Sequence, residues 1–314
     1  MKREFGSKLI EDVLPRLDLT HVIDTSGAYI PGHGTPTIIL LGCHRPPHND
    51  LHSPSNTVRA VMGIKGEPST PEDPANGLVW SAITRQIDEA ISESEFVSTA
   101  DVPRATLSVH PWSIGGGGAS NAKTILERNG TTTLRQLGAE IGYGAVTREN
   151  DAYLIGSRAL HRAGIDIKFI KQVVDGESVR AWSVADTFEA LWPYEEHTLE
   201  AQASLSIRQL LWAYRTGLSG RVAYGKTQLE RGLEWFEYSM FFKNRYSVPL
   251  SISFAFVATH NHFVFDRGGK VFIQSAPVIK MPEGTSEEVH LGLLGLLNSS
   301  AGCFWCQQVM HNKG

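Results

Sequence analysis

The stretch that decides the fold of this chain is Leu19-Thr-His-Val-Ile-Asp24-Thr-Ser-Gly-Ala-Tyr-Ile-Pro31-Gly-His-Gly-Thr-Pro36-Thr-Ile-Ile-Leu-Leu-Gly42. Residues 19–24 and 37–41 are apolar runs too short for helices, and their β-branched side chains favour buried strands. Glycines and prolines between the two runs interrupt regular structure and allow a sharply bent backbone. The pattern predicts two core strands joined by a stiff irregular loop, which is a common position for functional groups.

Length and composition limit the class of protein. With 314 residues and 41% hydrophobic content, the chain can bury at least one sizeable core and is expected to form two domains. Three cysteines are too few for a disulfide framework and indicate a reducing compartment. The sequence shows neither a signal segment nor a run of eighteen apolar residues, so we expect a soluble, cytoplasmic protein without membrane association. Because the net charge is −4, any contact with nucleic acid needs a local basic face.

The first forty residues have the pattern of the end of an α/β sheet. Residues 3–14 read as an amphipathic helix with Phe5, Leu9, Ile10, Val13 and Leu14 on one side. The strands at 19–24 and 37–41 are apolar enough to need cover on both faces, which one helix cannot provide. Residues 1–43 are therefore expected to need a partner sheet. Residues 44–76 are polar and rich in proline, and predict an extended excursion.

Further elements are predicted along the rest of the chain. Apolar spacing predicts helices at 78–91, 131–139, 199–218 and 227–240, and a capping box of Thr285 and Glu288 starts another that runs through Leu297. Strand patterns cover 105–109 and 251–280. Residues 262–265 and 270–273 are predicted to pair as an antiparallel hairpin around Asp266-Arg-Gly-Gly.

Four consecutive glycines, 115–118, precede a helical pattern and have two interpretations. They could cradle a phosphate at a helix N-terminus. The Gly-Lys-Ser/Thr ending of a P-loop is absent, however, since Lys123 follows Ala122. We therefore interpret the run as a flexible hinge between domains.

Two sets of residues have spacings found in metal sites. His44, His48 and His52 are four residues apart, but the prolines among them favour a solvated loop over a zinc-binding helix. Cys303 and Cys306 form a Cys-x-x-Cys spacing without a second pair, and we interpret them as buried small residues. No metal site is predicted.

Several long strings carry a resemblance to one family. They are residues 18–37 of the opening stretch, Val58-Arg-Ala-Val-Met-Gly-Ile-Lys-Gly-Glu-Pro-Ser-Thr-Pro, Gly138-Ala-Glu-Ile-Gly-Tyr-Gly-Ala-Val-Thr-Arg148, His260-Asn-His-Phe-Val-Phe-Asp-Arg-Gly-Gly-Lys-Val-Phe, Leu297-Asn-Ser-Ser and Phe304-Trp. In these strings the chain resembles adenine-specific (N6) DNA methyltransferases, and among them the PglX type of BREX, or phage growth limitation, systems. The helical segment at residues 1–11 resembles the helix that follows their catalytic motif.

Two motifs of that family do not occur in these 314 residues. They are the glycine-rich S-adenosylmethionine motif and the Asn-Pro-Pro-aromatic catalytic motif, both of which lie upstream in the family. The resemblance thus implies an internal fragment with S-adenosylmethionine as cofactor, although the chain lacks the binding motif and is expected to be inactive alone. Its expected partners are double-stranded DNA, the missing N-terminal methyltransferase half and other phage-defence proteins.

The resemblance also implies an architecture. Residues 1–43 would be the C-terminal edge of a Rossmann-like methyltransferase sheet, 44–137 the proline- and glycine-rich excursion with a helix and hinge, and 138–314 a truncated α+β target-recognition region. Seven Arg or Lys against four Glu between residues 199 and 246 give that segment a net charge of +3. Solvated helix faces often carry such clusters.

Candidate site residues follow from these expectations. The wall of a reaction pocket is assigned to Tyr29, Gly32, His33, Gly34 and Thr35, where His33 contacts a base or phosphate or simply caps the turn. Catalytic residues are expected elsewhere in the longer enzyme. The candidate DNA contacts are Arg148, Arg208, Arg215, Arg221, Lys226, His260, Asn261, His262, Arg267, Lys270 and Lys313.

Two other classes of function remain open. One is a non-catalytic DNA-recognition module that works alone or with a separate catalytic chain. The other is a metal-dependent hydrolase that uses the twelve histidines, although paired spacings such as His-Glu-x-x-His are missing.

Overall fold

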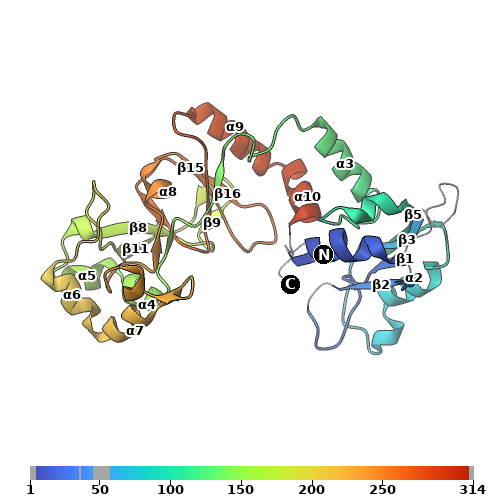
Figure 1. The fold of residues 1–314 in the computed structure, drawn as a ribbon, viewed down its shortest axis with the longest axis horizontal. Coiled ribbons are helices and arrows are strands. Elements are labelled where there is room, and N and C mark those ends of the chain that lie inside the picture. Colours follow the sequence, from blue (N-terminus) through green and yellow to red (C-terminus); the bar gives the residue numbers. More distant parts are fainter. Residues whose placement is uncertain (1–4, 35–36, 45–56, 311–314) are drawn as a thin grey trace. The chain divides into compact units, whose positions relative to one another are not determined.

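The computed structural model describes residues 5–34, 37–44 and 57–310, and it shows a mixed α/β fold with several sheets (Figure 1). The chain divides into two units, which we describe separately. Unit 1 comprises Met1–Thr131 and Phe304–Gly314, and unit 2 comprises Thr132–Cys303.

Unit 1 is built on a five-stranded sheet of order β2-β1-β3-β5-β4. The strands are β1 (Asp18–Asp24), β2 (Ile38–Cys43), β3 (Thr57–Gly63), β4 (Ile91–Glu93) and β5 (Val97–Pro103). β1 pairs antiparallel with β2 and parallel with β3, and β5 pairs antiparallel with both β3 and β4. The two strands predicted from the opening stretch are therefore confirmed.

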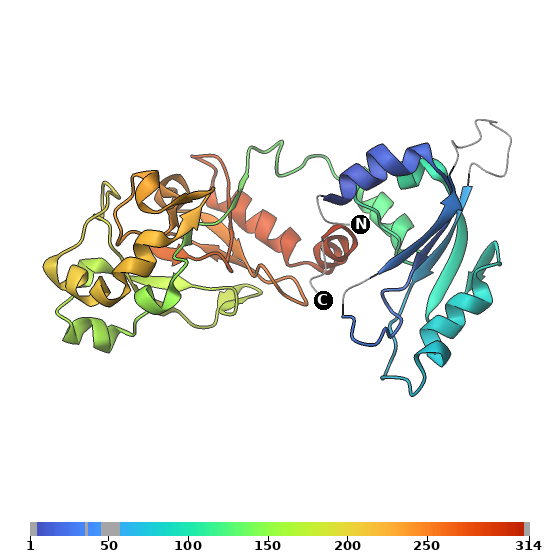
Figure 2. The ribbon, with the colours of Figure 1, turned by 60° about the horizontal axis from the view of Figure 1, so that its bottom comes forward.

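Helices cover both faces of this sheet (Figure 2). The N-terminal helical segment, made of α1 (Phe5–Ser7), η1 (Lys8–Val13) and η2 (Leu14–Arg16), packs Ile10 and Leu14 against Val22. On the other face, α2 (Leu78–Gln86) packs Val79 and Ile83 against Ile23 and Val61. Neighbouring residues of β1 thus serve opposite cores, as strand geometry requires.

The prediction that residues 1–43 need a partner sheet is wrong for β1. β3 pairs with β1 from within the predicted polar excursion, where Val58, Ala60 and Val61 form a short buried run. That run escaped prediction because proline-rich sequence surrounds it. β2 remains more open, with Ile39 37% and Leu41 44% exposed.

Several predicted helices differ from the observed ones. In the N-terminal segment Leu9 and Val13 are exposed, because η1 is a π-helix whose wider turn moves the apolar stripe. α2 ends at Gln86, and Ile91 lies 87% exposed in β4. Residues 104–108 form the 3₁₀ segment η5 instead of a strand, and residues 134–138 form turns instead of a helix.

The glycine run is packed against the sheet, so its interpretation as a flexible hinge is wrong. Gly116 N donates to Gly63 O at 2.9 Å, and Gly117 N donates to Ser98 Oγ at 3.2 Å. A Cβ atom at Gly116 would lie 2.7 Å from Met62 O, which only glycine avoids. Helix α3 (Ala119–Asn129) begins directly after the run.

Unit 2 contains two larger sheets. One has the order β11-β8-β17, formed by β8 (Ile170–Val174), β11 (Phe188–Leu191) and β17 (Lys270–Phe272). The other has the order β16-β15-β18-β6, formed by β6 (Glu140–Gly142), β15 (Ser251–Phe254), β16 (Phe263–Asp266) and β18 (Val278–Lys280). Between residues 251 and 280 the predicted β structure is therefore largely confirmed.

The predicted hairpin between residues 262 and 273 is wrong in its pairing. β16 and β17 are strands on either side of Gly268 and Gly269, which both have positive φ. β16 pairs with β15, however, whereas β17 pairs in parallel with β8. The turn therefore passes the chain from one sheet to the other.

Shorter elements complete unit 2. The two-stranded pairs are β9 (Val179–Arg180) with β10 (Ser183–Val184), β12 (Val222–Ala223) with β13 (Lys226–Thr227), and β7 (Ala145–Val146) with β14 (Met240–Phe241). The helices are α4 (Asn150–Tyr153), α5 (Ser157–Arg162), η6 (Ile167–Phe169), α6 (Leu205–Leu211), η7 (Trp212–Tyr214), α7 (Arg215–Gly220), η8 (Leu229–Arg231), α8 (Lys243–Ser247) and α9 (Glu287–Leu297). α10 (Ser300–Val309) spans the boundary of the two units.

The predicted helix at 199–218 is shorter and broken. Leu199 has φ 55°, and α6 begins only after Ser204, whose hydroxyl accepts from Ile207 N at 3.3 Å. The predicted helix at 227–240 is wrong, since the chain there forms β13, η8 and β14. α9 ends at Leu297 as predicted, but Ser286 instead of Thr285 is its N-cap residue.

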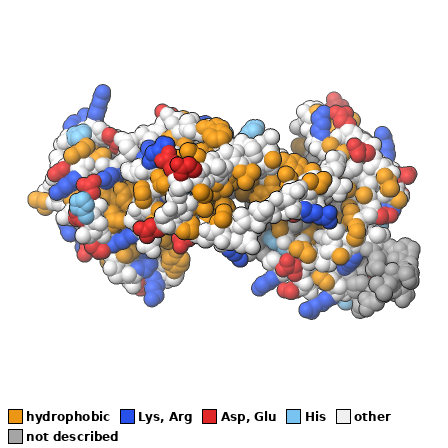
Figure 3. All heavy atoms as spheres, turned by 90° about the horizontal axis from the view of Figure 1, so that it is seen from above, with side chains coloured by type: hydrophobic (Ala, Val, Ile, Leu, Met, Phe, Trp, Pro, Cys, Tyr) orange, Lys and Arg blue, Asp and Glu red, His pale blue; other side chains and the backbone are white. Residues whose placement is uncertain are grey.

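Within the described ranges, no single helix is long and apolar enough to cross a membrane. α9 and α10 meet that length and composition only as a pair, bent by 68°. On the face drawn in Figure 3, Lys and Arg side chains are interspersed with Asp and Glu.

Candidate functional site

One hollow of unit 1 lies where two parallel strands end. β1 and β3 run side by side in register, so the loops after Asp24 and Gly63 leave the sheet at the same edge. Together these loops line an open pocket of about 450 Å³, formed by Ser26, Gly27, Ala28, Tyr29, Gly66, Glu67, Ser69 and Thr70. Ligands of α/β sheets commonly bind outside the carboxyl ends of parallel strands.

Hydrogen bonds fix the two loops to each other and to α2. Glu67 N donates to Gly27 O at 2.9 Å, and Gly27 lies so close to Gly66 that a Cβ would be 3.2 Å from its Cα. The Glu67 carboxylate accepts from Leu78 N at 2.7 Å and from Val79 N at 3.0 Å. It thereby occupies the N-terminal donors of α2, where a negative charge is favourable.

The loop between β1 and β2 is closed at its base and turned at its tip. Thr25 N donates to Thr37 O at 3.1 Å, and the two threonine hydroxyls are 2.6 Å apart. At the tip, His33 N donates to Ile30 O at 3.1 Å, with Pro31 and Gly32 (φ 70°) at the turn positions. Proline followed by a residue of positive φ is the pattern of a type II turn.

Of the five predicted pocket-wall residues, Tyr29 lines this pocket and is 37% exposed. Gly32, His33 and Gly34 lie at the exposed turn and do not line it. Thr35 lies outside the described residues. Glu67, Ser69 and Thr70 were missed, because their approach to Tyr29 depends on the unpredicted strand β3.

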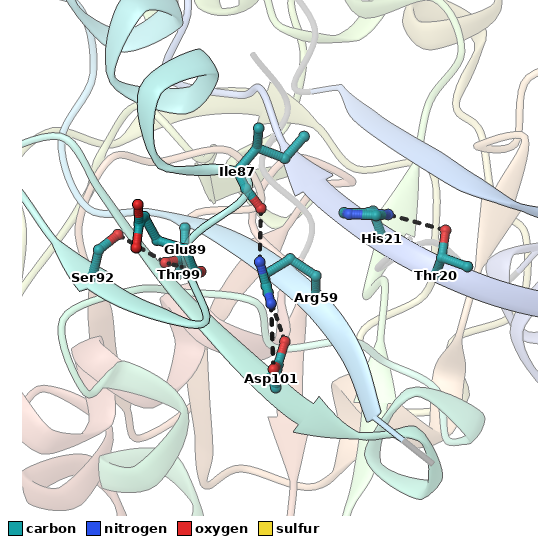
Figure 4. Close-up of polar contacts among 8 residues, drawn as sticks. All are labelled: Thr20, His21, Arg59, Ile87, Glu89, Ser92, Thr99 and Asp101. Carbon is teal, nitrogen blue, oxygen red and sulfur yellow. Dashed lines mark hydrogen bonds and ion pairs between the residues drawn. The ribbon is translucent and has the colours of Figure 1, made fainter. Parts of the chain in front are cut away.

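A polar row crosses the same sheet within its central strands (Figure 4). His21, Arg59 and Asp101 are register partners on β1, β3 and β5. Arg59 Nε donates to Asp101 Oδ1 at 2.6 Å, and Arg59 Nη1 donates to Ile87 O at 3.0 Å. The Asp101 carboxylate raises the pKa of Arg59, and this ion pair links β3 to β5, while the bond to Ile87 O links β3 to the end of α2.

The pocket of unit 1 does not fit S-adenosylmethionine by its own residues. Glu67 is the acidic residue that lines it, and its two oxygens already accept from Leu78 N and Val79 N. In the part of the chain that the structure describes, groups of three or more His, Cys, Asp or Glu placed to hold a metal ion are also absent. Cys306 is buried and Cys303 half-buried in α10, whereas His48 and His52 lie outside the described residues.

Three candidate DNA contacts lie around the β12–β13 hairpin. Arg148 is exposed, and its guanidinium donates to Val222 O. Lys226 is exposed on β13. Arg221 is only 7% exposed and donates to Leu218 O at 3.0 Å, Thr147 O, Trp235 O at 3.4 Å and Glu237 O at 2.6 Å. A buried guanidinium with four carbonyl partners holds the fold together, so we do not retain Arg221 as a DNA contact.

Arg208 and Arg215 are exposed on α6 and α7. The Arg208 guanidinium lies 4.8 Å from the centre of the Phe236 ring, and that of Arg215 lies 4.9 Å from the Trp212 ring. These stacked cations keep their N–H groups at the surface, where a phosphate can reach them.

The remaining candidates occupy two other positions. His260 and His262 have ring centres 6.4 Å apart, and burial, with Arg180 and His260 nearby, lowers the pKa of His262. Asn261 Nδ2 donates to Leu297 O at 2.7 Å. Arg267 pairs with Glu287 and Lys270 with Asp266, and Lys313 lies outside the described residues. Among the described residues, the candidates thus lie on different elements, and Arg267 and Lys270 are neutralised by carboxylates.

Comparison with known proteins relates the whole chain to one enzyme. The chain is 42% identical over 319 aligned residues to the adenine-specific methyltransferase PglX of Streptomyces coelicolor (strain ATCC BAA-471 / A3(2) / M145). The match covers 100% of this chain and 26% of that enzyme, so the chain spans about a quarter of its length. This confirms the predicted resemblance. No protein-family model matches the chain.

Solved structures show a likeness of fold. The type IIL restriction-modification enzyme MmeI, solved in complex with DNA, aligns over 95% of this chain and 33% of its own, with a TM-score of 0.50 and 12% identity. The type IIG restriction endonuclease BpuSI covers 95% of this chain and 34% of its own at 12% identity, but its TM-score of 0.39 is too low to carry an argument. At this identity, the likeness to MmeI concerns the fold alone.

Proposed function

We propose that this chain, related over its whole length to part of a PglX enzyme, forms the edge of the catalytic domain and the target-recognition portion of a DNA methyltransferase. That enzyme transfers a methyl group from S-adenosylmethionine to the N6 amine of adenine in DNA, within a phage-defence system. The observation that carries the proposal is the 42% identity over the full chain to an adenine-specific methyltransferase.

Unit 1 is assigned the edge of the catalytic domain. Its open pocket lies at the carboxyl ends of two parallel strands, where Tyr29 offers a partly exposed ring. A base taken out of the duplex is held by stacking and polar contacts, and Tyr29 has the chemistry for the first of these. The cofactor and the catalytic residues are assigned to the rest of the enzyme, because this chain lacks both motifs.

Unit 2 is assigned the contact with duplex DNA. Arg148, Arg208, Arg215 and Lys226 are four of its exposed basic candidates, whereas the exposed Arg267 is paired with Glu287. Such groups neutralise phosphates and position a protein on DNA, whereas base contacts supply specificity. MmeI, which shares the fold, was solved in complex with DNA and supports this assignment.

A second candidate function is a non-catalytic DNA-recognition module that works with a separate catalytic chain. In this alternative the chain binds DNA through the same exposed cations of unit 2 and leaves methyl transfer to the other chain. Both functions share the contact with DNA and differ in whether this chain is joined to a methyltransferase half.

The salt dependence of DNA binding tests the contact with DNA that both candidate functions share. Fluorescence anisotropy of a labelled duplex is measured with the 314-residue chain across a series of salt concentrations. We expect the logarithm of the binding constant to fall linearly with the logarithm of the salt concentration. The Arg208→Ala/Arg215→Ala variant should reduce the magnitude of that slope by about two, one for each lost phosphate contact.

The matched control is Arg85→Ala/Arg128→Ala, which removes two exposed cations from unit 1. It has the same net charge as the test variant and is expected to keep the wild-type slope. Absence of salt-dependent duplex binding by the wild-type chain would contradict the proposed function.

A further inference from the structure

The β12–β13 hairpin carries an aromatic residue at an unusual backbone position. Val222 pairs with Thr227 and Ala223 with Lys226, so Tyr224 and Gly225 form a two-residue turn. Their φ angles are 53° and 76°. A two-residue turn with positive φ at both positions is type I′, in which asparagine or glycine normally precedes the final glycine. Tyrosine occupies that position here.

Packing within the fold offsets little of the cost of this backbone conformation at Tyr224. The left-handed region is unfavourable for a residue that carries a Cβ atom. The Tyr224 side chain is 81% exposed, so packing does not offset that cost. A strained and exposed aromatic residue points to a role outside the fold of the chain itself.

The base of the hairpin is rigid. Ala223 is 2% exposed, and the Arg148 guanidinium donates to Val222 O. On the other strand, Thr227 donates from both its N–H and its hydroxyl to Glu230 Oε2, each at 2.7 Å. The buried Arg221 guanidinium precedes the hairpin and anchors its start. The turn therefore presents Tyr224 in a fixed position, which lowers the entropy lost on contact with a ligand.

The charges beside the turn favour an anionic partner. Arg148, whose guanidinium donates to Val222 O on β12, and Lys226 on β13 are both exposed beside it. Glu230, the carboxylate of the hairpin base, is engaged by Thr227. Arg231 lies near Arg148 and Arg221, and its pKa is lowered by burial and by those two cations. An exposed ring beside cations is the arrangement with which proteins stack on bases while they hold the backbone phosphates.

We infer that Tyr224 is a wedge that stacks on a base of duplex DNA, while Arg148 and Lys226 contact the flanking phosphates. This inference rests on the proposed function and adds to it a residue that supplies affinity by stacking. Apolar wedges of this kind open a base step and kink the duplex. Stacking is tolerant of sequence, because every base has a π face.

The test compares two substitutions at this position with one control elsewhere. Tyr224→Asn removes the ring but creates an Asn-Gly turn, which type I′ hairpins prefer, so the fold is retained. Tyr224→Phe keeps the ring. Phe188→Ala is the matched control, since Phe188 is a 45% exposed aromatic residue on β11 in the same unit. The probe is a random-sequence duplex that carries 2-aminopurine, whose fluorescence rises when it is unstacked.

We expect Tyr224→Asn to weaken binding roughly tenfold, as the loss of one stacked base does, with an unchanged salt slope because no charge is lost. The 2-aminopurine signal should disappear with Asn and persist with Phe. Wild-type affinity and signal in the Asn variant, or an equal loss in Phe188→Ala, would overturn this inference alone. Failure of the wild-type chain to bind any duplex would overturn the proposed function and this inference together.

Discussion

The side-chain amide of Asn298 pairs with both backbone groups of Phe263. Phe263 N donates to Asn298 Oδ1 at 3.1 Å, and Asn298 Nδ2 donates to Phe263 O at 2.8 Å. The amide thus takes the place of a neighbouring strand's peptide group beside β16. With Asn261 Nδ2 bound to Leu297 O, it ties the end of α9 to the sheet. This gives a physical reason for Leu297-Asn-Ser-Ser, a string that also carried the family resemblance.

Asn298→Asp is expected to destabilise the chain. The substitution keeps the shape and the acceptor but replaces the donor with a second acceptor that faces Phe263 O. Phe263 O would keep the bond from Trp182 N but face a repelling oxygen, which should lower the free energy of unfolding by about 1–3 kcal/mol in urea titrations. Asn244→Asp, at an exposed position of α8 in the same unit, is the control and should change it by less than about 0.5 kcal/mol. Equal effects at both positions would refute the bridging role.

Arg221→Lys is expected to be costly although it retains the charge. The guanidinium serves four carbonyls and lies 5.6 Å from the centre of the Tyr153 ring, and a lysine ammonium cannot reach all of these partners. Thermal or urea unfolding should show a loss of about 3 kcal/mol. Arg208→Lys, at an exposed stacked site, should stay close to wild type. Wild-type stability in the Arg221→Lys variant would mean that Arg221 is not the anchor we describe.

Because of Lys280, we expect the free energy of unfolding to rise with pH in mildly alkaline solution. Its ammonium is buried and donates to Val248 O and Leu250 O, and burial lowers its pKa from 10.5 to about 8, while Asp266 opposes the change. Between these pH values the unfolded chain binds more protons, so the free energy of unfolding increases with pH. Relative to Lys280→Met, the wild type should gain on the order of 2 kcal/mol from about pH 8 to about pH 10.5.

The control for this measurement is Lys168→Met, which removes an exposed lysine of unit 2. Its stability should follow the wild-type pH profile in parallel. A constant difference between wild type and Lys280→Met across the same pH interval would contradict the buried, easily deprotonated state of Lys280.

Local patterns in the sequence were sufficient for some elements. Apolar runs bounded by glycine and proline predicted β1 and β2, and the break after Leu297 was visible in the sequence. Strand partners were not predictable, because the pairing of β17 with β8 joins residues about a hundred positions apart. Of the residues that line the pocket, Tyr29 alone was predicted, and the second wall could not be, since it follows β3.

The segment at 227–240 shows why apolar residues at helical spacing led to a wrong helix prediction. Its backbone carbonyls are satisfied by side chains instead of helical N–H groups. Gln228 Nε2 donates to Glu234 O, Glu237 O and Tyr238 O, and Arg231 Nη1 donates to Ser239 O at 2.7 Å. Gly232 adopts a left-handed conformation that ends η8 after one turn. Such a polar scaffold leaves no periodic signal in the sequence.

The central claim is that this chain recognises DNA for a methyltransferase whose catalytic motifs lie outside it. The most direct test is the transfer of labelled methyl from S-adenosylmethionine to adenine in DNA, measured for the isolated chain and for the Streptomyces coelicolor PglX with its matching quarter replaced by this chain. We expect the hybrid to methylate adenine and the isolated chain to remain inactive, because the orientation of donor and amine requires both parts. Methylation by the isolated chain, or none by a folded hybrid that binds S-adenosylmethionine, would contradict the account.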